Sequence, residues 1–281
     1  MDELDNKRVD LHLHSSKSDG LYTPTSLVKL ALKYELAAIS ITDHETTAGV
    51  HEALEAGKKL GLEVVPGVEV GAYLNNRELH ILGYYPGKID KLETTLSKYR
   101  NERFERMDKM LYVLKKLSLP VNWNEVEKEA GNAAPGRLHL ARVMFKKGYV
   151  SSIDEAFEKY LEKGKPVYIP RVRLKVEEAI DLLNDCNAIP VLAHPGITNE
   201  DAQVLNYLKN TGLKGIEAYH PEHKEKKCLF YKQWAVSKGM VITGGSDFHG
   251  DEKESCPYPG YVSVNYACLE NLKLASSNTQ S

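Results

Sequence analysis

The sequence predicts an α/β fold in which a parallel sheet is covered by helices and interrupted by an all-helical insertion. Short apolar runs typical of strands alternate with segments whose apolar residues recur every three or four positions. Polar residues directly follow most of the apolar runs, as in parallel sheets with functional residues at the ends of the strands. Between residues 88 and 170 the strand pattern gives way to a helical period.

The first part of the chain alternates strands and helices. Thr23 and Pro24 supply an N-cap and a first-turn proline for the first helix. Gly61 ends a second helix, which runs through residues 51–60. The strands expected here are 9–14, 37–42, 63–70 and 78–84.

The predicted insertion begins with a long helical stripe of apolar residues from Leu92 to Leu117, and Ser152 and Glu155 form a capping box further on. After residue 170, helices near 176–184, 201–209 and 224–238 each lead into an apolar strand. We therefore expect residues 1–87 and 171–281 to form two parts of one α/β domain, and residues 88–170 to form a helical subdomain.

The composition excludes several classes of protein. The 281 residues carry a formal net charge of −2, so no global positive field marks a duplex-DNA binder. No apolar run approaches the roughly 20 residues of a membrane-spanning helix. The polar start is unlike a signal peptide, and the four cysteines are scattered, so we expect a cytoplasmic protein.

His12 and His14 lie two apart in the first predicted strand. Side chains two apart leave the same face of a strand, so both imidazoles point one way. Two imidazoles aimed at one spot suit a metal ion better than an apolar core, and the turn that follows offers Asp19 as an oxygen ligand. Taken alone, the pair is explained equally well as two half-buried histidines.

Other candidate ligands recur at the ends of later strands. The C-terminal ends of parallel strands in a barrel share one rim, where these side chains would meet. Nine nitrogen and oxygen ligands are too many for one ion and suit two or three, and mixed imidazole and carboxylate ligands suit Zn, Mn or Fe. The candidates are His12, His14, Asp19, His44, Glu69, His80, His194, Asp247 and His249.

These residues carry a resemblance to a known family. His12-Leu-His14, Thr42-Asp43-His44, Val68-Glu69, Ala193-His194-Pro195 and Asp247-Phe-His249 resemble the motifs of the PHP (polymerase and histidinol phosphatase) phosphoesterases, and the similarity covers nearly the whole chain. Gly136-Arg137-Leu-His139 and Val167-Tyr168-Ile169-Pro170 look like the branch that hydrolyses nucleotide 3′,5′-bisphosphates and the 5′ ends of short RNA.

The resemblance implies a distorted (β/α)7 TIM-like barrel with a di- or trinuclear metal centre. Metal-bound water loses a proton near neutral pH, so a metal-activated hydroxide would attack phosphorus without a protein base. By analogy with the family, His12, His14, Glu69 and Asp247 would hold one metal, Glu69, His80 and His194 a second with Glu69 bridging, and Asp19, His44 and His249 a third.

Three residues beside these motifs are candidates for catalysis. Asp43 either orients His44 or caps the following helix. His220 and His223 follow another strand, and one of them could protonate the leaving oxygen or bind phosphate. A rim histidine without a role is an equal alternative for both.

Candidate substrate contacts lie in the insertion. Arg137 and His139 belong to the motif that resembles the nucleotide-hydrolysing branch, and arginine binds phosphate with two parallel hydrogen bonds. Arg103 shares a helix with two other arginines, for which a solvated charged face is the alternative.

The sequence therefore predicts a metal-dependent phosphohydrolase acting on a 3′,5′-bisphosphorylated nucleotide or an RNA 5′ end, with no membrane partner and with an undetermined oligomeric state. A phosphatase for another small phosphomonoester, such as histidinol phosphate, is the enzymatic alternative. A degenerate barrel that serves as a binding module is the non-enzymatic one.

Overall fold

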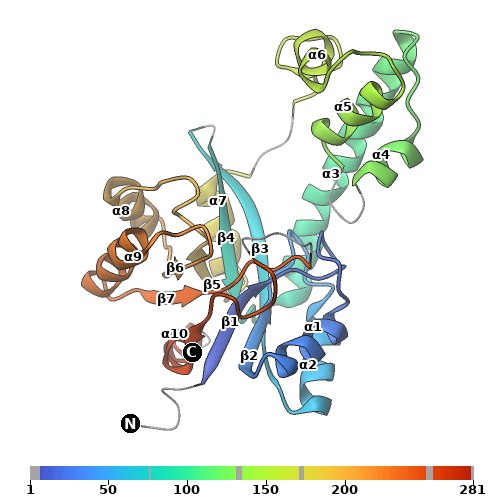
Figure 1. Ribbon diagram of the computed structural model, residues 1–281. Coiled ribbons are helices and arrows are strands. Elements are labelled where there is room, and N and C mark those ends of the chain that lie inside the picture. The colour runs from blue at the N-terminus through green and yellow to red at the C-terminus, as the bar shows by residue number, and fades with distance from the viewer. Residues whose placement is uncertain (1–6, 76, 131–134, 171–173, 251–255, 280–281) are drawn as a thin grey trace. The chain divides into compact units, whose positions relative to one another are not determined.

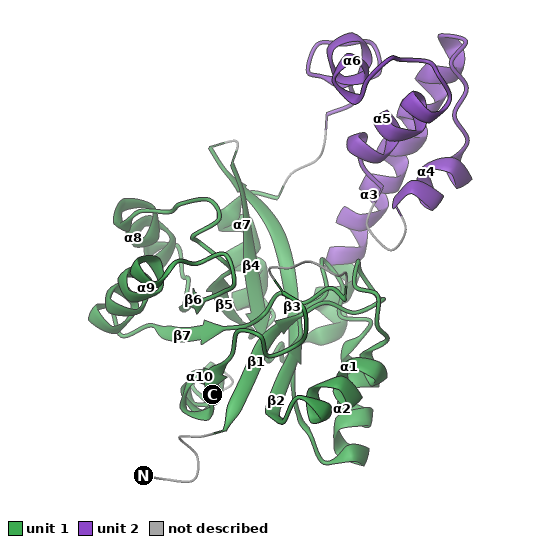
Figure 2. Cartoon of the chain, viewed as in Figure 1, with its two compact units in different colours: residues 1–95, 173–281 green, residues 96–172 purple. Residues whose placement is uncertain are grey.

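One sheet and its covering helices form the larger of two units. The computed structural model describes residues 7–75, 77–130, 135–170, 174–250 and 256–279. Unit 1 consists of Met1–Thr95 and Arg173–Ser281, and unit 2 of Leu96–Val172 (Figure 2). The second limit of the predicted insertion falls beside residues 171–173, which lie outside the described residues.

The sheet of unit 1 has the strand order β7-β6-β5-β4-β3-β2-β1-β8 (Figure 1). Strand β2 pairs parallel with both β1 and β3, and β6 pairs parallel with both β5 and β7. The strands are β1 (Arg8–Leu13), β2 (Leu36–Ile41), β3 (Glu63–Leu74), β4 (Arg77–Tyr84), β5 (Ile189–Leu192), β6 (Gly215–Tyr219), β7 (Val241–Gly244) and β8 (Val264–Asn265).

The expectation of a parallel sheet is wrong at β4, which pairs antiparallel with both β3 and β5. Strand β3 ends at Leu74 and β4 begins at Arg77, so no helix carries the chain back to the other end of the sheet. His80 therefore reaches the rim from the first half of β4 and not from the C-terminal end of a strand. Strand β8 is likewise antiparallel to β1.

The sheet curls into a nearly closed, TIM-like barrel, as the resemblance implies. Leu13, at the end of β1, forms a parallel bridge with Phe248, which lies beyond β7. Helices pack outside the strands, with α1 against β2, α2 against β3, α9 against β6 and α10 against β7 (Figure 1). These helices of unit 1 are α1 (Pro24–Lys33), α2 (Val50–Leu60), α7 (Val176–Asp185), α8 (Ala202–Asn210), α9 (Glu225–Ser237) and α10 (Tyr266–Ser277).

Local sequence signals determine where α1 begins and where α2 ends. The Thr23 side chain accepts a hydrogen bond from the Ser26 N–H, and Pro24 opens α1, as predicted. Gly61 ends α2 with a φ of 79°, a left-handed conformation that glycine adopts without a steric penalty.

Buried apolar side chains of β1 hold the rim in place. Val9 and Leu11 pack with residues of β3, β4, β5 and α10, while Leu13 packs with α1, β2 and α2. Tyr84 is fully buried, and its hydroxyl donates to the Leu11 carbonyl at 2.9 Å. Each fully buried apolar side chain stabilises the folded protein by about 1.5–3 kcal/mol. His12, which lies between Leu11 and Leu13, is therefore held on a well-packed strand.

Unit 2 is helical in its described residues and has its own apolar core, which includes Met107, Leu114, Leu140 and Leu161. The Ser152 side chain caps α6 by accepting from the Glu155 N–H, as the capping box predicts. None of the helices in the described part of the chain is long and apolar enough to cross a bilayer. The helices are α3 (Ile89–Lys116), which begins in unit 1, α4 (Trp123–Ala130), α5 (Arg137–Lys146), α6 (Ile153–Ala156) and a π-helix (Phe157–Leu161).

Candidate active site

The structure brings all nine candidate ligands together at one rim of unit 1. They come from β1, β3, β4 and the segments that follow β1, β2, β5 and β7. Their ligand atoms form four overlapping groups, within each of which the atoms lie no more than 4.8 Å apart. The groups are His14, Asp19, His44 and His249; His12, Glu69 and His194; His12, His14 and Asp247; and His44, Glu69 and His80.

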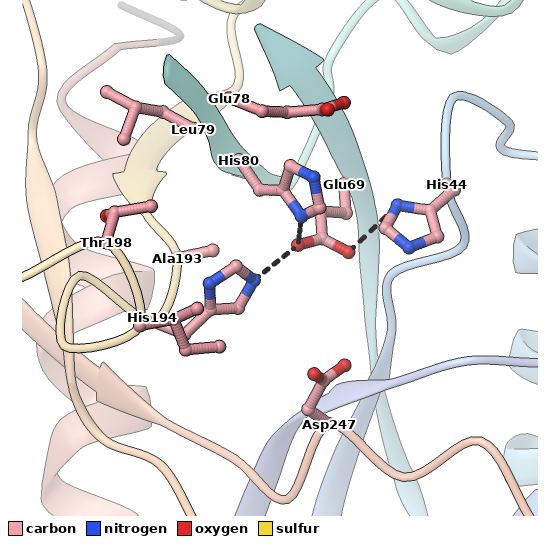
Figure 3. Close-up of a pocket in the computed structure, with 10 residues that line it drawn as sticks. His44, Glu69, Glu78, Leu79, His80, Ala193, His194, Thr198 and Asp247 are labelled. Atoms are coloured by element: carbon pink, nitrogen blue, oxygen red, sulfur yellow. Dashed lines mark hydrogen bonds and ion pairs between the residues drawn. The ribbon is translucent and has the colours of Figure 1, made fainter. Parts of the chain in front are cut away.

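Glu69 lies at the centre of the cluster, and its two carboxylate oxygens face different histidines (Figure 3). Oε1 lies 2.8 Å from His80 Nδ1 and 3.0 Å from His194 Nε2. Oε2 lies 3.1 Å from His14 Nε2 and 3.1 Å from His44 Nδ1, and 3.4 Å from His12 Nε2. A carboxylate placed between two sets of imidazoles has the geometry of a bridging ligand.

Asp247 and Asp19 extend the cluster on the side of β1. Asp247 Oδ1 lies 3.4 Å from His12 Nε2 and 3.2 Å from His14 Nε2. Asp19 Oδ1 lies 3.5 Å from His14 Nδ1 and 3.4 Å from His249 Nε2. Asp247 has a φ of 52°, in the left-handed region that residues other than glycine rarely adopt, so its backbone is strained.

The cluster fits divalent metal ions. His14 Nδ1 and Glu69 Oε2 are buried and have no hydrogen-bond partner, although a buried polar atom is normally satisfied. His12 Nε2 and His14 Nε2 lie 3.1 Å apart, and two neutral imidazoles can share such a short contact only if one of them donates a proton. Metal ions at this rim would satisfy both orphaned atoms with mixed nitrogen and oxygen ligands, which suit transition metals.

Without bound metal, the side chains compensate one another's charge. Burial works against a charge on His14, but the neighbouring Asp247 and Glu69 carboxylates prevail and raise its pKa to about 10. Burial also works against the charge on Glu69, yet neighbouring histidines, first His44 and His80, hold its pKa well below the usual range. Burial lowers the pKa of His44 to about 3. Protons therefore occupy part of the cluster in the metal-free protein.

Two buried carboxylates that support the rim were not predicted from the sequence. Asp10 accepts hydrogen bonds from the Ser246 N–H and hydroxyl and from the Gly260 N–H. Glu217 lies beside His12 and His194. The signal that could have identified both is an acidic residue within an apolar strand, because a buried charge requires partners.

The Asp43 side chain makes its hydrogen bonds to the loop that follows β1. Its oxygens accept from the Ser15 N–H at 2.7 Å, the Ser15 hydroxyl at 2.6 Å and the Ser18 hydroxyl at 2.7 Å. Helix α2 has Gly49 at its N-cap and no side-chain cap. Asp43 therefore fixes the turn that carries Asp19.

His220 and His223 differ in their surroundings. His220 is buried, and its Nε2 lies 3.4 Å from Asp247 Oδ2. His223 Nδ1 donates to the Ala218 carbonyl at 3.0 Å, and its Nε2 accepts from the Gly196 N–H at 2.9 Å. Both ring nitrogens of His223 are thus used by the backbone, whereas His220 faces the cluster.

Two cavities open at the rim. One, of about 310 Å³, lies over the ligand cluster (Figure 3) and is lined by His44, Glu69, Glu78, Leu79, His80, Ala193, His194, Ile197, Thr198 and Asp247. The other, of about 400 Å³, is lined by Gly196, Ile197, His220, Pro221, Glu222, Ser246, Asp247 and Cys256. Asp247 and Ile197 line both cavities. Both volumes lie within the range typical of small-molecule pockets, roughly 300–1,000 Å³.

The predicted substrate contacts lie in unit 2. Arg137 donates to the Leu161 carbonyl at 3.1 Å, and its guanidinium carbon lies 5.8 Å and 5.6 Å from the ring centroids of Phe157 and Tyr168. His139 Nδ1 accepts from the Gly136 N–H at 3.1 Å. Arg103 lies half-buried on α3. Their substrate roles stay predictions.

A barrel whose rim gathers imidazoles and carboxylates in this way is typical of a metal-dependent hydrolase. Comparison with known proteins identifies its family, because the PHP domain matches residues 10–169. The chain belongs to the PHP domain family, and it is a metal-dependent phosphoesterase.

Three similar proteins agree with this assignment. The 5′-3′ exoribonuclease Rnm of Escherichia coli is 34% identical over 260 residues, which cover 89% of this chain and 86% of that protein. The 3′,5′-nucleoside bisphosphate phosphatase of Chromobacterium violaceum is 30% identical and covers 86% of this chain and 87% of its own length. A crystal structure from Bifidobacterium adolescentis, assigned as a metal-dependent phosphoesterase, has a TM-score of 0.74 at 27% identity and covers 97% of this chain and 98% of that one.

Proposed function

We propose that the chain hydrolyses nucleotide 3′,5′-bisphosphates or the 5′ ends of short RNA with two or three divalent transition metals, Mn, Zn or Fe. The observation that carries the proposal is the position of Glu69, whose two oxygens face histidines on opposite sides. One carboxylate placed in this way would join two ions. The cluster around it offers nine ligand side chains, enough for a third.

The proposed ligand sets follow the contacts around each carboxylate. Glu69 Oε1 with His80 and His194 would form one set, and Glu69 Oε2 with His12, His14 and Asp247 another. Asp19 with His44 and His249 would form the third. When bound, the metals supply Lewis acidity, which neutralises phosphate charge and favours attack of water on phosphorus.

The chain's own residues would orient the substrate and move a proton. We assign the leaving-oxygen proton to His220, because this histidine lines a cavity next to Asp247. His223 accepts from the Gly196 N–H and would hold that segment in place. Gly196 lies two residues after the predicted ligand His194. Asp43, through Ser15 and Ser18, would hold Asp19 in place for its metal.

The substrate class is supported by the similar proteins, one named as an RNA exonuclease and one as a nucleoside bisphosphate phosphatase. Arg137, His139 and Arg103 remain the proposed contacts for a second phosphate. The rim is occupied by a complete set of ligand side chains, which favours an enzyme over a degenerate binding module. All four cysteines are free thiols, which supports the proposal of a cytoplasmic protein.

A substrate panel tests the proposal. Metal-reconstituted protein is assayed with adenosine 3′,5′-bisphosphate, a short RNA with a 5′-phosphate, a nucleoside 5′-monophosphate and histidinol phosphate. We expect kcat/KM to be highest for the bisphosphate or the RNA. A preference for histidinol phosphate would overturn the substrate assignment, and hydrolysis of none of the four would overturn the proposed function.

A further inference from the structure

Glu217 is a charged residue inside an apolar strand. It lies on β6 between Ile216 and Ala218, and its side chain is fully buried. Among the described residues it belongs to none of the four groups that could hold a metal ion. A buried carboxylate is strongly unfavourable unless both of its oxygens find partners, so its partners indicate what the residue does.

Both oxygens of Glu217 contact candidate ligand residues. Oε1 lies 3.0 Å from His12 Nδ1, the ring nitrogen on the far side from the cluster. Oε2 accepts a hydrogen bond from the His194 backbone N–H at 2.7 Å. His12 and His194 stand 182 positions apart in the sequence, at the ends of different strands, and Glu217 connects them across the barrel.

We propose that Glu217 is a positioning residue of the metal centre, which orients the His12 ring and fixes the backbone at His194 without binding metal itself. This inference rests on the proposed ligand set, in which His12 and His194 contact different ions. One carboxylate on β6 would therefore support two metal positions at once.

The contact with His12 determines which nitrogen is available to a metal. A carboxylate accepts and cannot donate, so His12 Nδ1 donates its N–H to Oε1. In the neutral ring, Nε2 then carries the lone pair, and Nε2 is the atom that lies 3.4 Å from Asp247 Oδ1 and 3.4 Å from Glu69 Oε2. Glu217 thus selects the tautomer in which His12 can act as a ligand.

The contact with His194 holds an unfavourable backbone conformation. His194 has a φ of 28°, which is rare for a residue other than glycine. Residues held in such conformations persist only when their surroundings fix them. The hydrogen bond from the His194 N–H to a charged acceptor, stronger than a neutral one, supplies such a restraint and aims the ring at Glu69 Oε1.

Glu217→Gln separates this role from simple burial. If the glutamine oxygen accepts from the His194 N–H, the amide N–H₂ faces His12 Nδ1 and forces the His12 proton onto Nε2, where it blocks the metal. If the oxygen faces His12 instead, the amide opposes the His194 N–H, and two donors meet. Either orientation breaks one of the two restraints in a side chain of nearly the same shape.

Metal affinity is measured by competition with a chelator, using zinc, on wild-type protein, Glu217→Gln and the control Glu200→Gln. Glu200 is also a buried carboxylate of unit 1, but it pairs with Arg77 at 3.0 Å and lies in none of the ligand groups of the described residues. Glu217→Gln should bind zinc roughly 10- to 100-fold more weakly. Glu200→Gln should lose thermal stability and keep its zinc affinity.

The outcomes are distinguishable. If the wild-type protein binds no metal, the proposed function fails. If the wild type binds zinc and Glu217→Gln binds it equally tightly, or if both variants weaken binding alike, only the positioning role fails.

A second measurement applies even if Glu217→Gln does not fold. In zinc-loaded wild-type protein labelled with 15N-histidine, the His12 ring, identified by its loss in His12→Gln, should carry its proton on Nδ1. A proton on Nε2 would overturn the proposal.

Discussion

The two units hold their candidate functional residues in contrasting ways. In the ligand cluster of unit 1, ring nitrogens and carboxylate oxygens face one another at separations from 2.8 to 3.7 Å, and two buried ligand atoms, His14 Nδ1 and Glu69 Oε2, have no hydrogen-bond partner. In unit 2 the polar atoms of Arg137 and His139 bond to backbone groups of their own unit. The cluster in unit 1 therefore has unsatisfied atoms that a metal ion could contact. Arg137 and His139 in unit 2 already use some of their donors and acceptors within the unit.

This contrast shows what residue positions alone can establish. Ligand atoms that converge and remain partly unsatisfied favour a bound cation, because orphaned polar groups are unfavourable in a buried site. An arginine that lies over two aromatic rings has a structural explanation as well as a functional one. The role of unit 1 therefore follows from its geometry, while the role of Arg137 depends on experiment.

The largest effect is expected for Glu69→Gln. Glutamine cannot serve as a charged bridge, so metal content and activity should fall together, with kcat/KM reduced by roughly 10³-fold or more. Bound metal is measured by elemental analysis, and hydrolysis of a nucleotide bisphosphate is assayed on the same preparation. A variant that keeps its full metal content and activity would show that the bridge is wrongly assigned.

The next effect separates two neighbouring histidines. His220→Asn should lower kcat by roughly 100-fold on a nucleotide substrate through loss of a general acid, and much less on p-nitrophenyl phosphate, whose leaving group needs no proton. His223→Asn should instead destabilise the fold by about 1–3 kcal/mol, since it leaves the Gly196 N–H and the Ala218 carbonyl without their partner. Equal losses of kcat on both substrates for His220→Asn would argue against the acid role.

Arg137→Ala sharpens the comparison from the side of unit 2. If Arg137 binds a second phosphate, kcat/KM for a 3′,5′-bisphosphate should fall on the order of 10- to 100-fold, and that for a 5′-monophosphate should change little. Arg106→Ala is the matched control, because Arg106 likewise donates to a backbone carbonyl of unit 2, that of Ile169 at 2.7 Å. If both variants lose only thermal stability, Arg137 is structural.

A smaller effect is expected from pH. Burial opposes the charge on His14, but its carboxylate partners raise its pKa to about 10, so this ring holds a proton at neutral pH in the metal-free protein. A metal must displace that proton, and the apparent metal affinity should therefore rise with pH toward that value, by up to about tenfold per pH unit for each proton released. Chelator competition at several pH values measures the slope. An affinity independent of pH would exclude proton release from the cluster.

Much of unit 1 could be predicted because its signals are local. Thr23, Pro24 and Gly61 set helix ends through neighbouring residues, and the His12-x-His14 spacing places two rings on one face of a strand. The antiparallel course of β4 was missed because polar residues at a strand's beginning and end look alike when only the sequence is read.

The unpredicted parts depend on contacts between distant residues. Glu217 and His12 are 205 positions apart, and neither local pattern indicates the other. For Asp43 the sequence suggests partners close along the chain, yet its side chain bonds to Ser15, which lies 28 positions away on another loop. A buried carboxylate shows its role only when the fold supplies its partners.

The central claim, that the rim of unit 1 is a multinuclear metal centre for phosphoester hydrolysis, is tested most directly on the wild-type protein. Metal content is determined after purification without chelator, and activity on adenosine 3′,5′-bisphosphate is then followed through chelation and readdition of Mn, Zn or Fe. We predict more than one equivalent of transition metal per chain, loss of activity on chelation and recovery on readdition. A metal-free preparation that hydrolyses the substrate at the full rate would contradict the account.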